Sequence, residues 1–232
     1  MDELKNYFSH LDEMKLNNFI DGKNTTIDIL KDLKNYTDQF ALNNHDNYPD
    51  VWIEGDVLIG NNVKIDAFTK IVGPVIIGDN CEISTNVFIR PNTILCNDVH
   101  VGHGSEIKES LIMNGAKIAT NVFVGNSIIG NKTRVGSGTI LANRRFDQDT
   151  IKIKNYNTDE KIETELDFFG AVVGDESRLG ANCTTMPGCH IGHDTFVASG
   201  LQVGGYIESN VLVDNETYKN LKITPKEKIE LK

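Results

Sequence analysis

The sequence has little of what marks several common classes of protein. No apolar run approaches the ~18 residues of a membrane-spanning helix, and the acidic start MDELKNYFSH lacks the features of a signal peptide. Basic residues are few, with 23 Lys and Arg against 33 Asp and Glu, for a net charge of −10. This balance disfavours nucleic acid or an anionic membrane as the main partner. We expect a soluble cytoplasmic protein.

Cysteines are also scarce. The four of them, Cys81, Cys96, Cys183 and Cys189, form no CxxC pair, and the closest two are six residues apart. This spacing favours reduced structural thiols over disulfides or metal ligands.

What the sequence does have is an internal repeat. From Ile59 to Ile107 an apolar residue recurs at every sixth position, and the series resumes after short steps of five. The repeating positions are Ile59, Ile65, Ile71, Ile77, Ile83, Ile89, Leu95, Val101, Ile107, Ile112, Ile118, Val124, Ile129, Val135, Leu141, Val173, Leu179, Ile191, Val197 and Val203, with Thr185 holding one place. Four residues after most of them comes a small or β-branched residue, which includes Cys81, Cys183 and Cys189.

A period of six fits neither a helix nor a hairpin sheet. It predicts short flat strands that meet at corners, three to a coil of about 18 residues, with the coils stacked at the ~4.8 Å spacing of paired strands. The expected fold is an all-β parallel β-helix of hexapeptide repeats over residues 49–213. The spans 51–141 and 170–206 hold about seven coils.

Three segments lie outside the repeat. Residues 1–48 form a helical leader, with a helix over 26–41 that Thr25 and Asp28 cap. An earlier short helix would use Leu4, Phe8 and Leu11, and such helices would dock on the open first coil. Residues 142–170 interrupt the repeat, and alternation around NYNTDE predicts an excursion hairpin. The tail, 214–232, is expected to form a strand or arm over the last coil.

Stacking converts sequence distance into proximity. Arg90 and Lys108 each follow a repeat position by one residue and are three faces apart, so they should stand about 5 Å apart on neighbouring coils. Two such cations repel unless an anion lies between them, and a phosphate suits both side chains. The alternative is that both point into water or are neutralised by Glu106 or Glu109.

A second column contains His103 and Thr120, with Ser137 above them. Here His103 is either a general base or an ordinary corner histidine. The five-residue step between Val124 and Ile129 lies close to Thr120, and we interpret it as the frame of a functional corner.

The stretch from FIRPNT through VHVGHGSEIKESLIMNGAKIATNVFVGNSIIG to VGSGTILANRRFD resembles the acetyltransferase half of bifunctional sugar-1-phosphate nucleotidylyltransferase/acetyltransferases, such as the glucosamine-1-phosphate enzymes. The likeness covers about residues 50–205. It implies a left-handed winding, a homotrimer, and acetyl-CoA or another acyl-CoA as co-substrate between subunits. The nucleotidylyltransferase half has no counterpart here, so a separate nucleotidylyltransferase is a possible partner.

The resemblance also assigns roles. Arg90 and Lys108 match the pair that holds the sugar phosphate, Asn143 matches an asparagine that reaches the substrate from a neighbouring subunit, and Ser137 matches the loop along the coenzyme A arm. A zinc site of the hexapeptide carbonic-anhydrase kind is not expected, because the histidines lack the His-x4-His spacing. No metal requirement is implied.

The chain departs from this family at two positions. Thr120 and Phe123 stand where the family has its catalytic histidine and a tyrosine, and a threonine hydroxyl cannot replace an imidazole base near neutral pH. Two functions remain. One is CoA-dependent transfer of an acyl group to an amino sugar or its phosphate, in nucleotide-sugar or cell-envelope metabolism, with His103 as substitute base. The other is a catalytically degenerate trimer that binds a sugar phosphate or nucleotide sugar, or scaffolds a nucleotidylyltransferase.

Overall fold

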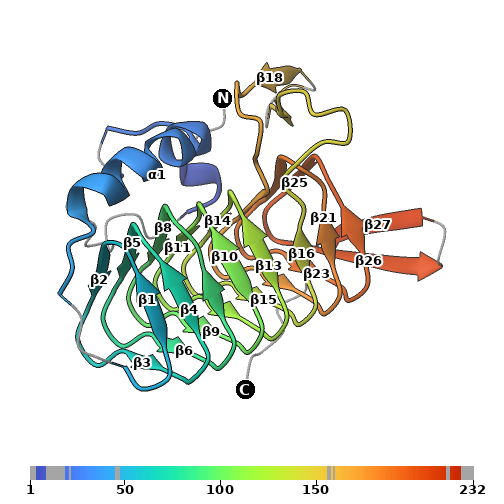
Figure 1. Ribbon diagram of the computed structural model, residues 1–232. Coiled ribbons are helices and arrows are strands. Elements are labelled where there is room, and N and C mark those ends of the chain that lie inside the picture. Colours follow the sequence, from blue (N-terminus) through green and yellow to red (C-terminus); the bar gives the residue numbers. More distant parts are fainter. Residues whose placement is uncertain are drawn as a thin grey trace.

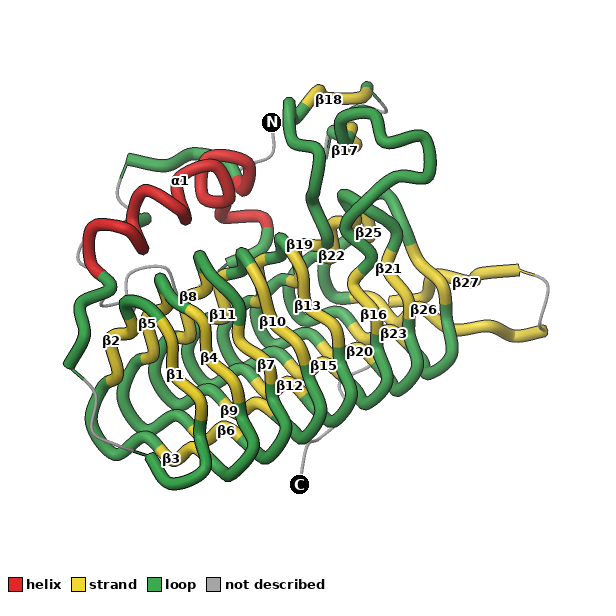
Figure 2. Tube along the Cα trace, in the orientation of Figure 1, coloured by secondary structure: helices red, strands yellow, loops and turns green. Residues whose placement is uncertain are grey.

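The computed structural model describes residues 4–8, 19–20, 22–44, 48–155, 158, 160–217 and 220–225. Its body is a three-sided parallel β-helix, in which short strands meet at corners and successive coils stack on one another (Figures 1 and 2). Within the described residues two faces carry eight strands each and the third carries nine. The predicted β-helix of hexapeptide repeats is confirmed.

We name the faces A, B and C in the order in which each coil visits them. Face A contains β1 (Trp52–Glu54), β4 (Lys70–Val72), β7 (Phe88–Ile89), β10 (Glu106–Lys108), β13 (Phe123–Gly125), β16 (Ile140–Leu141), β21 (Thr184–Thr185) and β24 (Gln202–Val203). Face B contains β2 (Val57–Ile59), β5 (Val75–Ile77), β8 (Thr93–Leu95), β11 (Leu111–Ile112), β14 (Ile128–Ile129), β19 (Ala171–Val173), β22 (Cys189–Ile191) and β25 (Tyr206–Ile207). Face C contains β3 (Lys64–Ile65), β6 (Glu82–Ile83), β9 (His100–Val101), β12 (Lys117–Ile118), β15 (Arg134–Val135), β20 (Arg178–Leu179), β23 (Phe196–Val197), β26 (Val211–Thr217) and β27 (Asn220–Pro225).

The repeat positions form the core of the coil. On face A, Ile71 pairs with Ile89, and Ile89 with Ile107, and all three are fully buried. Cys81, Cys183 and Cys189 are free thiols in the same core, as the register predicts. Faces A and B carry eight parallel strands each in the described chain, and face C has seven within the spans 51–141 and 170–206, so these spans hold about seven complete coils, as estimated. Strand β26, beyond residue 206, completes one more coil.

The helix α1 (Thr26–Phe40) forms as predicted, and both hydrogen bonds of its capping box are present. Its predicted docking place was wrong. It packs against face B, where it contacts β5 and β8, rather than on the open first coil (Figure 1). The physical reason is that the strands of face B are apolar on their outer side as well. Ile76, Ile94 and Leu111 lie in one buried cluster with Leu33 and Tyr36 of the helix.

The open edge of the first coil is met by two asparagines instead. Asn43 accepts a hydrogen bond from the backbone N–H of Val57 at 3.0 Å, and Asn44 accepts one from Ile59 at 2.8 Å. These side chains satisfy donors of β2 that have no preceding strand. The short 3-10 helix η1 (Leu4–Asn6) precedes α1, and Leu11 of the predicted early helix lies outside the described residues.

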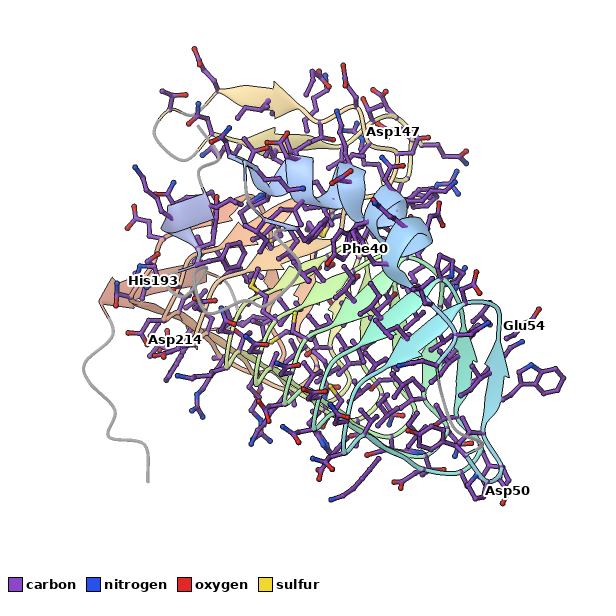
Figure 3. The ribbon with its side chains drawn as sticks, turned by 90° about the vertical axis from the view of Figure 1, so that its left-hand side faces the viewer. Phe40, Asp50, Glu54, Asp147, His193 and Asp214 are labelled. Atoms are coloured by element: carbon purple, nitrogen blue, oxygen red, sulfur yellow. The ribbon has the colours of Figure 1, made fainter. Side chains whose placement is uncertain are left out.

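The excursion at 142–170 contains the antiparallel pair β17 (Lys152–Lys154) and β18 (Lys161–Glu163), which stands above the coils in Figure 1. At the far end, β26 and β27 form an antiparallel hairpin that extends from face C, while 226–232 of the predicted tail lie outside the described residues. Figure 3 shows Asp50, which precedes β1, and Glu54, the last residue of β1, at the opposite end of the solenoid from Asp214.

No helix among the described residues combines the length and the apolar character needed to cross a membrane.

Candidate functional site

Arg90 and Lys108 lie on neighbouring coils at the corner between faces A and B. Ile89 pairs with Ile107 in the ladder, and the backbone N–H of Arg90 donates to the carbonyl of Ile107 at 2.8 Å. The side chain of Lys108 is 13% exposed and that of Arg90 is 41% exposed. The predicted stacking of these two cations is therefore present.

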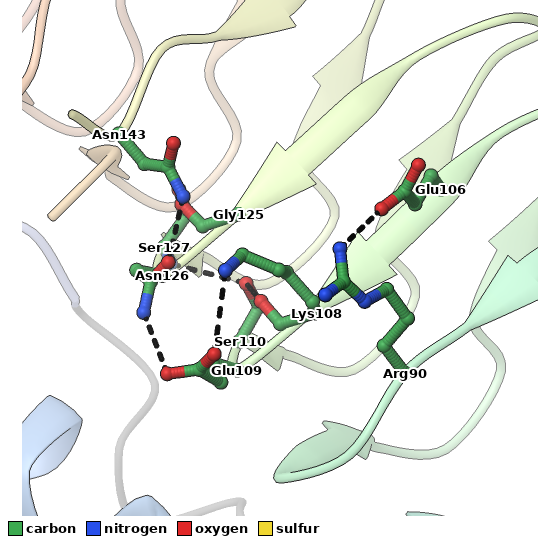
Figure 4. A network of polar contacts seen from close by, with 9 residues as sticks. All are labelled: Arg90, Glu106, Lys108, Glu109, Ser110, Gly125, Asn126, Ser127 and Asn143. Atoms are coloured by element: carbon green, nitrogen blue, oxygen red, sulfur yellow. Dashed lines mark hydrogen bonds and ion pairs between the residues drawn. The ribbon is translucent and has the colours of Figure 1, made fainter. Parts of the chain in front are cut away.

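Each cation has a carboxylate neighbour, which the alternative interpretation foresaw. A guanidinium nitrogen of Arg90 lies 2.8 Å from Glu106, and the Nζ of Lys108 lies 3.4 Å from Glu109 (Figure 4). The contact of Lys108 is the longer one, so its ammonium keeps room for a second acceptor. An anion that binds at this corner must compete with both carboxylates.

The two short steps of the repeat fall at this same corner, not at Thr120. They place Glu109 and Asn126 at the turns with positive φ values of 46° and 50°. The side-chain amide of Asn126 donates to Glu109 at 2.9 Å, and that of Asn143 donates to Asn126 at 2.7 Å (Figure 4). The sequence analysis named Glu109 only as a neutraliser of the cations, missed Asn126, and put the short step beside the wrong corner. The five-residue step was the sequence feature that marked the corner between faces A and B.

Gly125 leaves the space in which two predicted site residues meet. A Cβ on Gly125 would lie 2.7 Å from the amide nitrogen of Asn143 and 2.8 Å from the ring of Phe123. Gly125 also pairs with Lys108 in the ladder. Lys108, Phe123 and Asn143 therefore surround one glycine, which no larger residue can replace without displacing them.

The excursion adds an aromatic wall to this corner. The ring of Phe168 lies between two cations, with the Nζ of Lys108 at 4.9 Å and the guanidinium carbon of Arg144 at 5.2 Å from its centroid. Phe168 thus holds Lys108 by a cation–π contact. The excursion at 142–170 therefore contributes two residues to this corner: Asn143 near its start and Phe168 near its end.

The second predicted column lies at the corner between faces C and A. His103 and Thr120 are on adjacent coils, since Val101 pairs with Ile118. The hydroxyl of Thr120 donates to Ser137 at 3.1 Å. Thr120 and Ser137 line an open groove of about 560 Å³ along face C.

The imidazole of His103 is exposed and has one hydrogen-bond partner in the part of the chain that the structure describes. Its Nδ1 lies 3.0 Å from the carbonyl oxygen of Thr85, which can only accept a hydrogen bond, so Nδ1 carries the proton. The other nitrogen, Nε2, then has a free lone pair. The column at His103 and the corner at Lys108 are at opposite ends of β10, with the outer side of face A between them.

His190 and the buried thiols Cys81 and Cys189 have structural surroundings. His190 is buried against the rings of Tyr7 and Phe169, and it hydrogen-bonds Thr26 at 3.1 Å. The described residues contain no group of three or more His, Cys, Asp or Glu side chains arranged to hold a metal ion. Burial raises the pKa of the Cys81 thiol to about 11 and that of Cys189 to about 12.

Comparison with known proteins gives related sequences. Residues 71–162 match the family model of the GMPPB C-terminal domain. The bifunctional protein GlmU of Methanococcus vannielii is 34% identical over 181 residues, which cover 78% of this chain and 42% of the relative. The putative uncharacterized acetyltransferase YaiX of Escherichia coli is 33% identical over 141 residues, which cover 61% of this chain and 60% of the relative.

Among solved structures, the UDP-N-acetylglucosamine acyltransferase LpxA from Bacteroides fragilis superposes with a TM-score of 0.53 at 18% identity, over 77% of this chain and 74% of that chain. The chain spans about two fifths of the length of the GlmU relative. It folds as a left-handed β-helix of hexapeptide repeats and, over that β-helix, resembles the acetyltransferase half of GlmU proteins.

Proposed function

We propose that this protein transfers an acyl group from acyl-CoA, with acetyl-CoA the first candidate, to the amine of a phosphorylated amino sugar. The observation that carries the proposal is the corner at which Arg90 and Lys108 stand on adjacent coils, beside Asn143 and Phe123 around Gly125. Two stacked cations suit the phosphate of such a sugar. One relative is named a bifunctional sugar-1-phosphate nucleotidylyltransferase/acetyltransferase, and this name supports the same chemistry.

In this proposal the acceptor lies across the outer side of face A. Its phosphate is held by Arg90 and Lys108. When the phosphate binds, each cation moves partly away from its carboxylate neighbour, Glu106 or Glu109, to contact the anion. The sugar ring packs on Phe123, and the amine points toward the corner of His103 and Thr120. Asn143, which Asn126 orients, offers its amide to the reacting carbonyl at the His103 corner of a neighbouring copy in the proposed trimer.

The proposed reaction is an aminolysis of the thioester. The amine nitrogen attacks the thioester carbonyl, a C–N bond forms, and the C–S bond breaks as coenzyme A leaves as its thiol. The proton that the amine loses goes to Nε2 of His103, directly or through a water held by Thr120, because Nδ1 is already committed to Thr85. The coenzyme A arm lies in the groove beside Ser137.

We propose a homotrimer in which the loop after Asn143 reaches a second copy. Support comes from exposed apolar side chains around that loop. Phe146 is 102% exposed, Ile140 41% and Met186 37%. Exposed apolar side chains gathered in one place mark interaction surfaces. The polar Arg144, which contacts Phe168, lies in the same loop.

A thiol-release assay tests the proposal. The protein and acetyl-CoA are incubated with glucosamine-1-phosphate, glucosamine and galactosamine-1-phosphate, and free coenzyme A is measured. We expect release with a phosphorylated amino sugar and loss of it in Lys108→Ala. Lys64→Ala is the matched control, because Lys64 also pairs with a carboxylate, Glu82 at 3.0 Å, but on face C. No release with any acceptor contradicts the enzymatic function.

A second candidate function is favoured by Thr120. An exposed threonine, bonded to Ser137, occupies the position where the resembling family has its base. In that case the protein is a trimeric binding or scaffold module for a sugar phosphate, a nucleotide sugar or a separate nucleotidylyltransferase. The match to a C-terminal domain, that of GMPPB, is in keeping with such a role. Sugar-phosphate binding by calorimetry without any thiol release would favour this function.

A further inference from the structure

Aromatic and cationic side chains alternate down face A from the candidate site toward the first coil. Trp52 pairs with Lys70, and Lys70 pairs with Phe88, so the three form one outward column. The Nζ of Lys70 lies 5.5 Å from the ring centroid of Trp52 and 5.8 Å from that of Phe88. Above them, the guanidinium carbon of Arg90 lies 5.9 Å from the ring of Phe88. The column therefore joins the phosphate corner to an aromatic end.

This aromatic end is exposed. Trp52 is 65% exposed and Phe68 is 72% exposed, and together they line a shallow hollow of about 520 Å³. Large aromatic side chains usually bury most of their area, because they are costly to leave in water. Two of them side by side at the surface form a flat apolar platform.

Phe68 is also held in a backbone conformation that costs free energy. Its φ is 63°, in the left-handed region that bulky residues rarely adopt. The equivalent corners of the later described coils use asparagine or glycine, namely Asn86, Gly104, Asn121, Gly138, Asn182 and Gly200. Phe68 is the bulky exception in this column. Strained residues of this kind persist at functional sites.

The ammonium group of Lys70 is a positive charge that can bind an anion. Among the described residues no carboxylate lies within ion-pair distance of it, unlike Arg90 and Lys108. Lys70, Arg90 and Lys108 stand on three consecutive coils, so they present cations over about 10 Å along the β-helix axis. A single phosphate cannot meet all three.

We propose that the platform of Trp52 and Phe68 binds the base of a nucleoside diphosphate, whose phosphates lie along Lys70, Arg90 and Lys108. This inference rests on the proposed function for the identity of the attached group, which is then the amino sugar at Phe123. The acceptor is a nucleoside-diphosphate sugar that runs down face A. Any base has a face for stacking, so the platform accepts purines and pyrimidines alike.

The chain carries a built-in reporter for this site, because Trp52 is its single tryptophan. Its fluorescence, excited at a wavelength where nucleotides do not absorb, is followed while uridine diphosphate, guanosine diphosphate, inorganic pyrophosphate or glucosamine-1-phosphate is added. We expect both nucleotides to quench the emission with saturable dissociation constants. Pyrophosphate and the sugar phosphate should leave it nearly unchanged. Equal quenching by pyrophosphate overturns the proposal, because the signal then reports charge and not a base.

Calorimetry on variants gives an independent test. Trp52→Leu should weaken binding of uridine diphosphate about tenfold or more, in line with base stacking on an aromatic ring, and leave glucosamine-1-phosphate unaffected. Phe196→Leu is the matched control, since Phe196 also stacks with a cation, Arg178 at 5.6 Å, but on face C. Unchanged affinity in Trp52→Leu overturns the proposal.

Phe68→Asn separates a functional from a structural role. It should weaken nucleotide binding and at the same time raise Tm by ~2–4 °C, because asparagine accepts a positive φ more readily. A rise in Tm with full nucleotide affinity removes Phe68 from the site and contradicts the platform.

The outcomes for the two proposals are distinct. Thiol release with glucosamine-1-phosphate, combined with no quenching by nucleotides, leaves the acyltransferase standing and overturns the platform. Quenching by nucleotides without thiol release from any acceptor, a uridine-diphosphate amino sugar included, leaves the platform standing and overturns the acyltransferase.

Discussion

The side-chain amide of Asn143 donates a hydrogen bond to the side-chain oxygen of Asn126 at 2.7 Å, across the gap from one coil to the next. Asn126 in turn donates to Glu109 at 2.9 Å, and Glu109 contacts Lys108. A chain of side chains thus connects the proposed phosphate ligand with the proposed amide donor. The orientation of Asn143 depends on a residue that touches neither substrate.

Asn126→Gly tests this connection. Glycine accepts the φ of 50° at this corner, so the variant removes the side chain without adding backbone strain. We expect kcat to fall about fivefold to tenfold, the worth of one hydrogen bond, while the KM for the sugar phosphate stays within twofold. The variant Asn126→Asp keeps the acceptor for Asn143 but loses the donor to Glu109 and sets two carboxylates side by side, so it should retain more of kcat than Asn126→Gly while raising the KM for the sugar phosphate. Equal losses in kcat and sugar-phosphate binding for both variants would assign Asn126 a purely structural role.

Arg90→Ala and Lys108→Ala test whether one anion is shared. Each variant should weaken sugar-phosphate binding by ~1.5–3 kcal/mol, typical of hydrogen bonds to charged groups, with the assembly state unchanged. Titration calorimetry and light scattering measure the two quantities. Because both cations already have carboxylate neighbours, unchanged affinity in both variants would mean that Glu106 and Glu109 are their true partners.

The coil and much of its core could be predicted from period alone, because a repeat of six with small residues four positions later has few other solutions. The place of α1 could not. The apolar stripe of Ile29, Leu33 and Tyr36 indicates that one side of the helix is buried. It does not indicate which face of the β-helix covers that side. The strands VII, TIL and LI of face B, apolar at consecutive positions, held that information. The side-chain hydrogen bonds of Asn126 could not be predicted either, because a five-residue step marks a corner but does not identify the side chains that meet there.

The buried thiols predict how stability changes with pH. Burial raises the pKa of the Cys189 thiol to about 12, above its value in the unfolded chain near 8.5. Between these values the unfolded chain releases a proton that the folded chain keeps, so the unfolded state binds fewer protons and stability falls as pH rises. The expected loss from this thiol is ~1.4 kcal/mol per pH unit above about pH 9.

Urea unfolding between pH 8 and pH 10.5 measures this slope. Other groups titrate in the same range, so the comparison is with Cys189→Ala. This variant is less stable near pH 8 but should show a shallower decline, by the contribution of one thiol. The same slope in both proteins would mean that the folded chain loses the proton of Cys189 as readily as the unfolded chain does.

The last prediction concerns the base that replaces a missing histidine. His103 lies one coil from Thr120, with Nδ1 bound to the carbonyl of Thr85 and Nε2 free to take a proton. If His103 accepts the proton of the amine, His103→Ala should lose at least ~10²-fold in kcat. Initial rates of coenzyme A release at saturating substrate measure this loss.

Thr120→His is the complementary change. The side chain of Thr120 is exposed and lines an open groove with Ser137, so an imidazole fits there without repacking the core. Because the cation pair and Asn143 are in place, the new histidine should raise activity and make it independent of His103, so that Thr120→His combined with His103→Ala stays active. Full activity in His103→Ala alone would show that the base lies elsewhere. No turnover in the natural protein and none in Thr120→His would leave the binding or scaffold module as the function, with the phosphate corner as its site.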